Sequence, residues 1–184
     1  MSAKLVVLSG PSAVGKGTLA SFIIAKNEDF ELSVSATTRS ARSGEVEGES
    51  YYFVTEEEFS RLIESAELLE WATVHGRHRY GTPRLPVEKA LAKGRNVVLE
   101  IDVQGAFQVK KAFPAAVLVF VNPPSFQELE ARMNKRGTET PEDKRLRLET
   151  AKSELLQAES FDFQVINDEV ARCAQEVVDL VKSN

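Results

Sequence analysis

A glycine-rich loop near the start of the chain carries the strongest chemical signal. Residues 10–18 read GPSAVGKGT and directly follow the apolar run at residues 4–9. Glycines let the backbone curl so that successive N–H groups point at phosphate oxygens, and a helix starting there adds its dipole. Lys16 is placed to reach the β- and γ-phosphates of a nucleotide. We therefore predict a nucleotide phosphate site made of Gly10, Pro11, Ser12, Ala13, Val14, Gly15, Lys16, Gly17 and Thr18.

This loop departs from the usual phosphate-loop pattern at one position. Gly17 stands where Ser or Thr is usual, and the hydroxyl comes one residue later at Thr18. A hydroxyl directly after the lysine normally helps to hold Mg²⁺. Thr18 is therefore the loop's candidate metal ligand, displaced by one residue from the usual place.

Two arginines and two tyrosines in the middle of the chain could bind a second phosphate. Arg39 and Arg42 are three residues apart, and Tyr51 and Tyr80 supply hydroxyl donors. Guanidinium groups hold phosphate through two parallel hydrogen bonds. The plainer alternative is that the arginines are solvated surface charges.

Three carboxylates stand in or directly after apolar runs. Glu70 is the one charge within residues 68–72, so it either faces water or binds a pair of parallel donors. Glu100 and Asp102 end the run at residues 97–102 and alternate onto one face. That end of a strand is where open α/β sheets place their ligands. The two acids could orient Mg²⁺-bound water or touch an acceptor base.

A second group of arginines surrounds a short irregular segment. Arg132 and Arg136 fall on one helical face just before residues 137–140, and Arg147 follows in the next predicted helix. The segment could hinge a lid. Because acidic residues alternate with the arginines, a mixed-charge helix surface is the alternative.

Apolar strands alternating with helices must position these residues. The predicted strands span residues 4–9, 96–101, 116–121 and 163–166. The predicted helices span residues 18–26, 86–93, 104–111, 125–136, 141–159 and 169–182. This alternation predicts an α/β fold with a parallel sheet covered by helices on both faces.

Residues 35–82 interrupt this rhythm. We expect an Arg-rich turn, a short strand at residues 51–54, and a helix begun by Thr55 with Glu58 completing a capping box. A further strand at residues 68–74 and a hairpin-like loop at residues 76–82 follow. The segment is predicted to form a small inserted lobe.

Composition excludes several classes of protein. The chain has 184 residues, enough for one domain with a core, and a net charge of −5, which disfavours a nucleic-acid binder. Its one cysteine, Cys173, excludes an internal disulfide and points to a reduced, cytoplasmic location. The longest apolar run, residues 115–121, is far short of the roughly 20 residues that span a membrane. We expect no membrane segment and no leader, and the sequence predicts no oligomeric state.

At this point the chain resembles the guanylate kinases, which belong to the P-loop nucleoside monophosphate kinases. Besides the phosphate loop, the matching motifs are SVSATTRSAR, GESYYFV, LLEWA, YGT, LEIDVQG, RGTET and VIND, in that order. The resemblance implies Mg²⁺-dependent phosphoryl transfer from ATP to GMP, and to dGMP, giving ADP and the nucleoside diphosphate. It also implies one domain with a core (residues 1–34, 83–125 and 159–184), a GMP-binding lobe (35–82) and a helical lid (about 126–158).

The resemblance further implies a role for each candidate residue. Lys16, Arg39, Arg136 and Arg147 would be catalytic, and Arg132, Arg136 and Asn167 would join the loop in binding ATP. Asp102, through water, would be a second candidate for holding Mg²⁺. The GMP site would consist of Ser35, Arg39, Arg42, Tyr51, Glu70, Tyr80, Thr82, Glu100 and Asp102. Within that set, Glu70 would read the N1–H and 2-amino donors of guanine, and Ser35 and Thr82 would add hydroxyl groups.

Three alternatives differ in class. Another P-loop small-molecule kinase would phosphorylate a different nucleotide or a phosphorylated sugar. A guanylate-kinase-like binding module would recognise a protein, but such modules typically have a degraded phosphate loop, whereas Lys16 is present here. A nucleic-acid-binding ATPase would need a basic–aromatic patch, which the sequence lacks.

Overall fold

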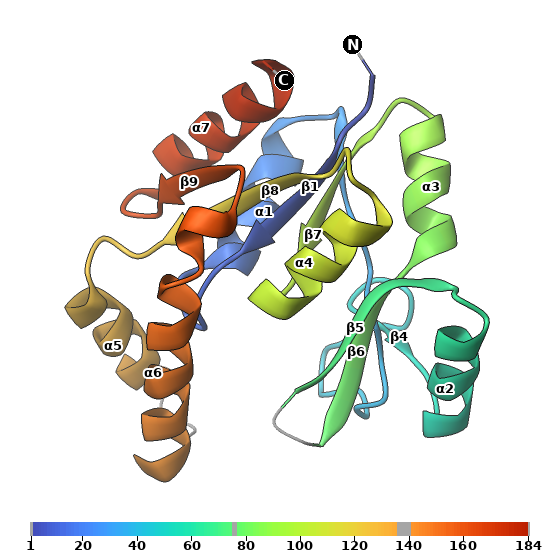
Figure 1. Cartoon of the computed structure of the whole chain (residues 1–184), viewed down its shortest axis with the longest axis horizontal. Coiled ribbons are helices and arrows are strands. Elements are labelled where there is room, and N and C mark those ends of the chain that lie inside the picture. Colours follow the sequence, from blue (N-terminus) through green and yellow to red (C-terminus); the bar gives the residue numbers. More distant parts are fainter. Residues whose placement is uncertain (1, 75–76, 136–140, 184) are drawn as a thin grey trace.

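The computed structural model describes residues 2–74, 77–135 and 141–183. A sheet of parallel strands forms the core of the described chain, in the order β2-β7-β1-β8-β9 (Figure 1). These strands are β1 (Leu5–Ser9), β2 (Phe30–Leu32), β7 (Asn96–Glu100), β8 (Val117–Asn122) and β9 (Phe163–Ile166). The predicted parallel sheet is confirmed, and its carboxyl edge faces the two lower lobes of Figure 1.

Helices bury both faces of this sheet because the strands are apolar on both sides. In β1, Val6 and Leu8 pack with α1 (Lys16–Lys26) and α7 (Val170–Ser183). Leu5 and Val7 point the other way, toward α3 (Arg84–Ala92) and α4 (Val103–Ala112). All four side chains are fully buried. The strand after which the phosphate loop begins is thus fixed from both sides.

Two further helices extend beyond the carboxyl edge of the sheet. They are α5 (Phe126–Lys135) and α6 (Pro141–Leu155), and they lie side by side (Figure 1). Leu129 and Met133 of α5 and Ala151 of α6 are buried in the cluster beneath α1 and α7. Helix α6 ends at Leu155, earlier than expected. The 3-10 turn η1 (Ala158–Ser160) then returns the chain to β9.

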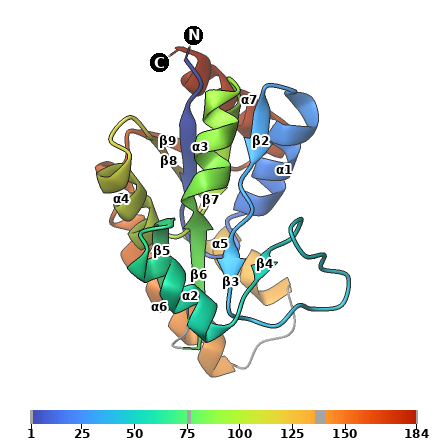
Figure 2. The ribbon, with the colours of Figure 1, turned by 90° about the vertical axis from the view of Figure 1, so that its right-hand side faces the viewer.

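A second, smaller sheet lies across from α5 and α6 in Figure 1 and in front of them in Figure 2. Its strands are β3 (Ala36–Thr37), β4 (Tyr52–Phe53), β5 (Leu68–Val74) and β6 (His78–Pro83), in the order β4-β3-β6-β5. Helix α2 (Glu56–Glu64) covers it through Phe59, which packs on Ala36 and Leu68. The predicted capping box of Thr55 and Glu58 is confirmed.

Besides the earlier end of α6, three strands differ from the sequence-based prediction. The expected hairpin-like loop over residues 76–82 is wrong, because residues 78–83 form β6, which pairs with both β3 and β5. A Cβ on Gly81 would lie 2.8 Å from the backbone oxygen of Glu70, so the close approach of β5 and β6 requires the glycine. Strands β2 and β3 were not predicted, since they contain only three and two residues.

The helices carry no membrane signal. Within the described ranges, none is long and apolar enough to cross a bilayer.

Candidate active site

The phosphate loop lies between β1 and α1, at the carboxyl edge of the sheet. Gly10 and Gly15 have φ angles of +141° and +98°, which glycine adopts without strain. Gly15 precedes α1 and makes no side-chain hydrogen bond to its first turn, and this helix N-terminus is where a phosphate would gain from the N–H groups and the helix dipole. Lys16 Nζ donates to the carbonyl oxygens of Gly10 and Pro11, at 2.6 and 3.2 Å. The lysine therefore arches over the loop.

The unusual Gly17 has a structural reason. A Cβ on this residue would lie 3.1 Å from Oε2 of Glu100, which ends the neighbouring strand β7. A side chain here would push the carboxylate away from the loop. Because Gly17 has no side chain, the Glu100 carboxylate can lie beside the loop at the position where other phosphate loops carry a Ser or Thr hydroxyl.

The residues around the loop fit a magnesium ion. Mg²⁺ is usually bound through one or two carboxylates, with water and substrate phosphates completing its octahedral shell. Glu100 supplies a carboxylate beside the loop, and Thr18 is exposed on the first turns of α1. In the parts of the chain that are described, no three His, Cys, Asp or Glu side chains gather as a closed metal cage.

Glu70 is the most unusual carboxylate of the site. It is 5% exposed, and Oε1 accepts a hydrogen bond of 2.7 Å from the hydroxyl of Thr82, which is also buried. Burial raises the pKa of Glu70 to about 7; the Thr82 hydrogen bond opposes this shift and the negative charge of Asp102 adds to it. The sequence-based alternative of a strand residue facing water is wrong for Glu70. A buried, sparsely bonded carboxylate can accept further hydrogen bonds from a ligand.

The first turn of α4 faces this carboxylate. Asp102 caps the helix by accepting a 2.7 Å hydrogen bond from the N–H of Gly105. A Cβ on Gly105 would lie 2.8 Å from Oε2 of Glu70 and 3.3 Å from Oδ1 of Asp102. The absence of a side chain at Gly105 therefore allows Glu70 of the small sheet to approach Asp102 of the core.

Arg39 is held by an anion and by aromatic rings. Its guanidinium pairs with both carboxylate oxygens of Glu45, at 2.8 and 3.0 Å, and donates to the Tyr80 hydroxyl at 3.1 Å. It also lies 5.3 Å from the ring centre of Tyr51 and 6.0 Å from that of Phe53. The Arg39 hydrogen bonds lower the pKa of Glu45 to about 2, with help from the Arg42 backbone. The predicted Arg39, Tyr51 and Tyr80 are brought together.

The other predicted residues of this group are less closely placed. Arg42 is exposed, and its backbone N–H donates to Glu45 at 2.7 Å. Ser35 is half-buried beside β3 and its backbone oxygen accepts from Tyr52 at 2.9 Å. Glu45 was missed by the sequence analysis; its signal is that it is the first of three alternating acids, Glu45, Glu47 and Glu49, directly after Arg39 and Arg42.

Asn167 and Arg132 tie the far end of the phosphate loop to β9 and α5. Asn167 is 3% exposed, and its Nδ2 donates to the Val14 oxygen at 2.9 Å. Arg132 donates to the same oxygen at 3.2 Å and to the backbone oxygen of Asn167 at 3.2 and 3.3 Å. Asn167 Oδ1 is buried with no hydrogen-bond partner among the described residues. This buried acceptor is available to a ligand donor beside the loop.

Helix α6 adds one predicted and one unpredicted residue. Arg147 is half-buried on this helix, whereas Arg136 lies outside the described residues, as does the segment 137–140. Glu154 near the end of α6 was not predicted. Burial raises its pKa, the positive charge of Lys16 opposes the shift, and the negative charge of Asp102 adds to it. A carboxylate of α6 is therefore part of the electrostatic environment of Lys16.

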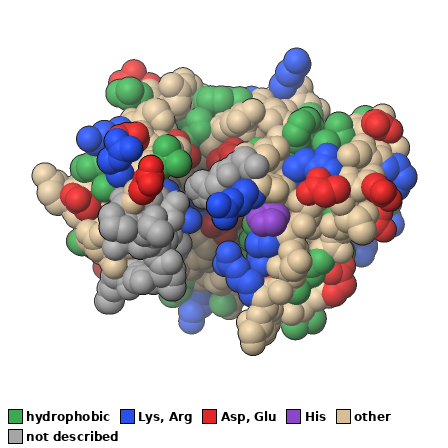
Figure 3. Space-filling view, turned by 90° about the horizontal axis from the view of Figure 1, so that it is seen from below, with side chains coloured by type: hydrophobic (Ala, Val, Ile, Leu, Met, Phe, Trp, Pro, Cys, Tyr) green, Lys and Arg blue, Asp and Glu red, His purple; other side chains and the backbone are tan. Residues whose placement is uncertain are grey.

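Several basic side chains lie beside the hollow at this edge of the molecule (Figure 3). In that view, Lys and Arg side chains lie on both sides of the hollow, between the small sheet and the helices beyond the carboxyl edge. Such an arrangement can bring two anions together, because cations and hydrogen-bond donors offset their mutual repulsion. The site has the composition needed for phosphoryl transfer.

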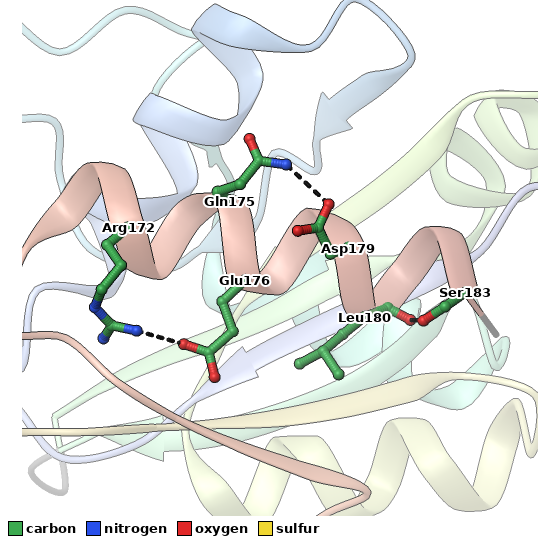
Figure 4. A pocket seen from close by; sticks show the side chains of 6 residues that line it. All are labelled: Arg172, Gln175, Glu176, Asp179, Leu180 and Ser183. Carbon is green, nitrogen blue, oxygen red and sulfur yellow. Dashed lines mark hydrogen bonds and ion pairs between the residues drawn. The ribbon is translucent and has the colours of Figure 1, made fainter.

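A separate groove lies on α7, away from these residues. It has a volume of about 630 Å³ and is lined by Arg172, Gln175, Glu176, Asp179, Leu180 and Ser183 (Figure 4). Arg172 pairs with Glu176 and Gln175 with Asp179, both at 2.8 Å. These intrahelical pairs engage its charged groups, and none of the predicted site residues lines it.

Comparisons with known proteins agree with the geometry. A family model described as guanylate kinase matches residues 2–184. A guanylate kinase of Leifsonia xyli subsp. xyli is 55% identical over 177 residues, covering 96% of this chain and 70% of that protein. The crystal structure of guanylate kinase from Anaplasma phagocytophilum superposes with a TM-score of 0.79 at 35% identity, covering 99% of this chain and 86% of that one.

A gluconokinase from Sinorhizobium meliloti 1021 shares the fold at lower similarity. Its crystal structure superposes with a TM-score of 0.53 at 17% identity, covering 98% of this chain and 92% of that one. At this identity the likeness concerns the fold alone.

Proposed function

This chain belongs to the guanylate kinase family, and from that premise we propose that it transfers the γ-phosphoryl group of ATP to GMP, giving ADP and GDP. The acceptor phosphate carries a charge of about −2 at pH 7, because its second pKa is near 6. Its oxygen is already an ionised nucleophile, so the reaction needs no general base. Catalysis then consists of positioning and electrostatic stabilisation.

The buried carboxylate of Glu70 is the observation that carries the choice of acceptor. Guanine presents N1–H and a 2-amino group as two parallel donors, and a carboxylate accepts from both. Adenine lacks this donor pair, so AMP would leave Glu70 buried and unpaired. A site built to accept hydrogen bonds rejects ligands that cannot donate them. Thr82, Asp102 and Ser35 complete the proposed base site, with Glu100 at its edge.

The acceptor phosphate is proposed to bind to Arg39, Arg42, Tyr51 and Tyr80. In the structure, the Arg39 guanidinium donates two parallel hydrogen bonds to the Glu45 carboxylate. A phosphate can accept hydrogen bonds from the same guanidinium in the same bidentate geometry. Glu45 thus keeps the guanidinium in position while the site holds no acceptor. This arrangement preorganises the arginine for an anion.

The donor ATP is proposed to lie along the phosphate loop, residues 10–18. Lys16 would contact its β- and γ-phosphates, and Arg132, Arg136 and Arg147 would offset charge on the triphosphate. Asn167 Oδ1, buried without a partner among the described residues, suits the amino group of adenine. Mg²⁺ would be held beside the loop by Glu100, Thr18 and Asp102, directly or through water, and would neutralise charge on the phosphates.

We further propose that residues 35–82 form the GMP lobe and residues 126–158 a lid that closes over both substrates. Closure excludes water that would otherwise hydrolyse ATP. Saturation with GMP and a non-hydrolysable ATP analogue should lower the radius of gyration in solution scattering. An unchanged radius with both ligands bound would contradict a moving lid.

An acceptor panel tests the function directly. ADP release is measured with Mg-ATP and GMP, dGMP, AMP, CMP, UMP or no acceptor, with Lys16→Met as the inactive control. Turnover with GMP and dGMP alone is the expected result. The runner-up, a P-loop kinase for another small molecule, would give turnover only with a different acceptor, and that result would remove Glu70 from base recognition. A protein-binding module would bind nucleotide without turnover.

A further inference from the structure

Strand β5 is irregular at the residue that is proposed to read the base. Leu68 pairs with Pro83 of β6, and Trp71 pairs with Gly81. Three steps along β5 therefore match two steps along β6, so one extra residue lies between Leu68 and Trp71. Such a bulge re-aims a side chain, and it contains Glu70, which is 5% exposed.

A bulge on an edge strand needs an additional anchor. A slip of pairing by one residue turns every side chain of a strand to the opposite face. β5 is the last strand of the small sheet, so β6 holds it on one side only. A slip at this position would move the Glu70 carboxylate away from the site.

Gln108 of α4 supplies this anchor from the core. Its Oε1 accepts from the backbone N–H of Trp71 at 3.1 Å, and its Nε2 donates to the Trp71 backbone oxygen at 2.9 Å. A glutamine amide carries one acceptor and one donor group, so it satisfies both backbone groups that Trp71 presents at the edge. The side chain takes the place of a neighbouring strand.

The same face of α4 also contacts the Glu70 side chain. Asp102, Gly105 and Gln108 follow at intervals of three residues, so they lie on one side of the helix. Gly105 leaves room for the carboxylate of Glu70, and Gln108, one turn later, holds the backbone of the next residue. One helix thus positions both the side chain and the main chain of the bulge.

We propose that Gln108 is a positioning residue for acceptor recognition: by holding Trp71 against α4 it keeps the β5 bulge in register and Glu70 aimed at Asp102. Gln108 itself does not contact the acceptor. The proposal rests on the proposed role of Glu70 in reading guanine. It makes the core helix, and not the small sheet alone, responsible for discrimination between GMP and AMP.

Gln108→Met tests this role, because Met has nearly the same length and forms neither hydrogen bond. We expect kcat/KM for GMP to fall about tenfold, because two hydrogen bonds that hold Trp71 are replaced in part by water. The preference for GMP over AMP should fall by a similar factor, while KM for ATP stays within about twofold. Lys111→Met, on an exposed position of the same helix, should match the wild type.

A pH profile and a second variant separate positioning from general destabilisation. The transition near pH 7 in the pH dependence of KM for GMP should move toward lower pH in Gln108→Met, because a loosened Glu70 is better hydrated. If the Met variant does not fold, Gln108→Asn keeps the amide but is one methylene shorter, and the same loss of preference is expected.

Each contrary outcome overturns the proposal. An unchanged GMP-to-AMP preference in a folded Gln108 variant, or parallel losses for ATP and GMP together with a lowered melting temperature, would show a purely structural or absent role. If Glu70→Gln also leaves the preference unchanged, the proposed base recognition fails as well. If Glu70→Gln lowers it and the Gln108 variants do not, only the positioning role is refuted.

Discussion

Replacing Glu70 by Gln should change stability and activity in opposite directions. Burial raises the pKa of this carboxyl from an ordinary 4.5 to about 7. Because a difference of one in pKa corresponds to about 1.36 kcal/mol, the ionised side chain destabilises the ligand-free fold by about 3 kcal/mol. A Gln has nearly the same shape, can accept the Thr82 hydrogen bond, and carries no charge.

The sign of the stability effect depends on pH. Because the folded-state pKa is raised, the stability that the neutral carboxyl contributes is fully present below about pH 4.5 and is lost as pH rises through about 7. Glu70→Gln should therefore match the wild type near pH 4.5 and be more stable at pH 8. For a chain of this size, about 3 kcal/mol corresponds to a melting temperature roughly 6–12 °C higher.

The activity of Glu70→Gln should fall because the variant loses the charged acceptor that is proposed to bind guanine. Hydrogen bonds to a charged group contribute about 1.5–3 kcal/mol each, and Gln replaces one acceptor oxygen by an amino group that faces the guanine donors. A loss of about 3 kcal/mol lowers kcat/KM for GMP by about 100-fold. AMP gains no such contact from Glu70, so the difference between GMP and AMP should narrow.

Two measurements test this reasoning together. Thermal melting of the ligand-free protein between pH 4.5 and 8 tests the stability effect, and coupled ADP-release kinetics with GMP and AMP test recognition. In the wild type, KM for GMP should rise as pH falls through about 7, and this transition should be absent in Glu70→Gln, leaving only the titration of GMP itself near pH 6. A variant that is less stable at pH 8, or that loses GMP and AMP turnover equally, would refute a buried base-reading carboxylate.

Three other substitutions test separate parts of the site. Gly17→Ala should lower kcat several-fold and raise the Mg²⁺ concentration for half-maximal rate, because its Cβ would lie 3.1 Å from Glu100; an unchanged Mg²⁺ requirement would contradict this role of Glu100. Glu45→Gln should raise KM for GMP about tenfold and leave KM for ATP unchanged, since Arg39 loses a charged partner; an equal effect on both substrates would count against the phosphate clamp. Asn167→Ala should raise KM for ATP about tenfold, because it removes the buried Oδ1 acceptor proposed for adenine and the Val14 contact that orients it, and a rise in KM for GMP instead would place the adenine elsewhere.

Local chemistry in the sequence was sufficient to predict the main elements and the phosphate loop. Runs of Val and Leu require burial on both faces, so the parallel strands β1, β7, β8 and β9 and their covering helices follow from the pattern of apolar runs, whereas the short strand β2 does not. The loop at residues 10–18 needs glycines for its backbone and a lysine for its charge, and both are visible as letters. The capping box of Thr55 and Glu58 is likewise a local pattern.

Tertiary structure decided the contacts that give these residues their properties. Whether Glu70 faces water or the interior depends on a bulge in β5, on Gly81 opposite it, and on α4, whose residues are more than 30 positions away in the chain. Gly17 is explained only by Glu100 on a neighbouring strand, and strand β6 only by partners on both sides. The physical reason is that burial and hydrogen bonding depend on distances through space, whereas propensity and periodicity report only on neighbours along the chain.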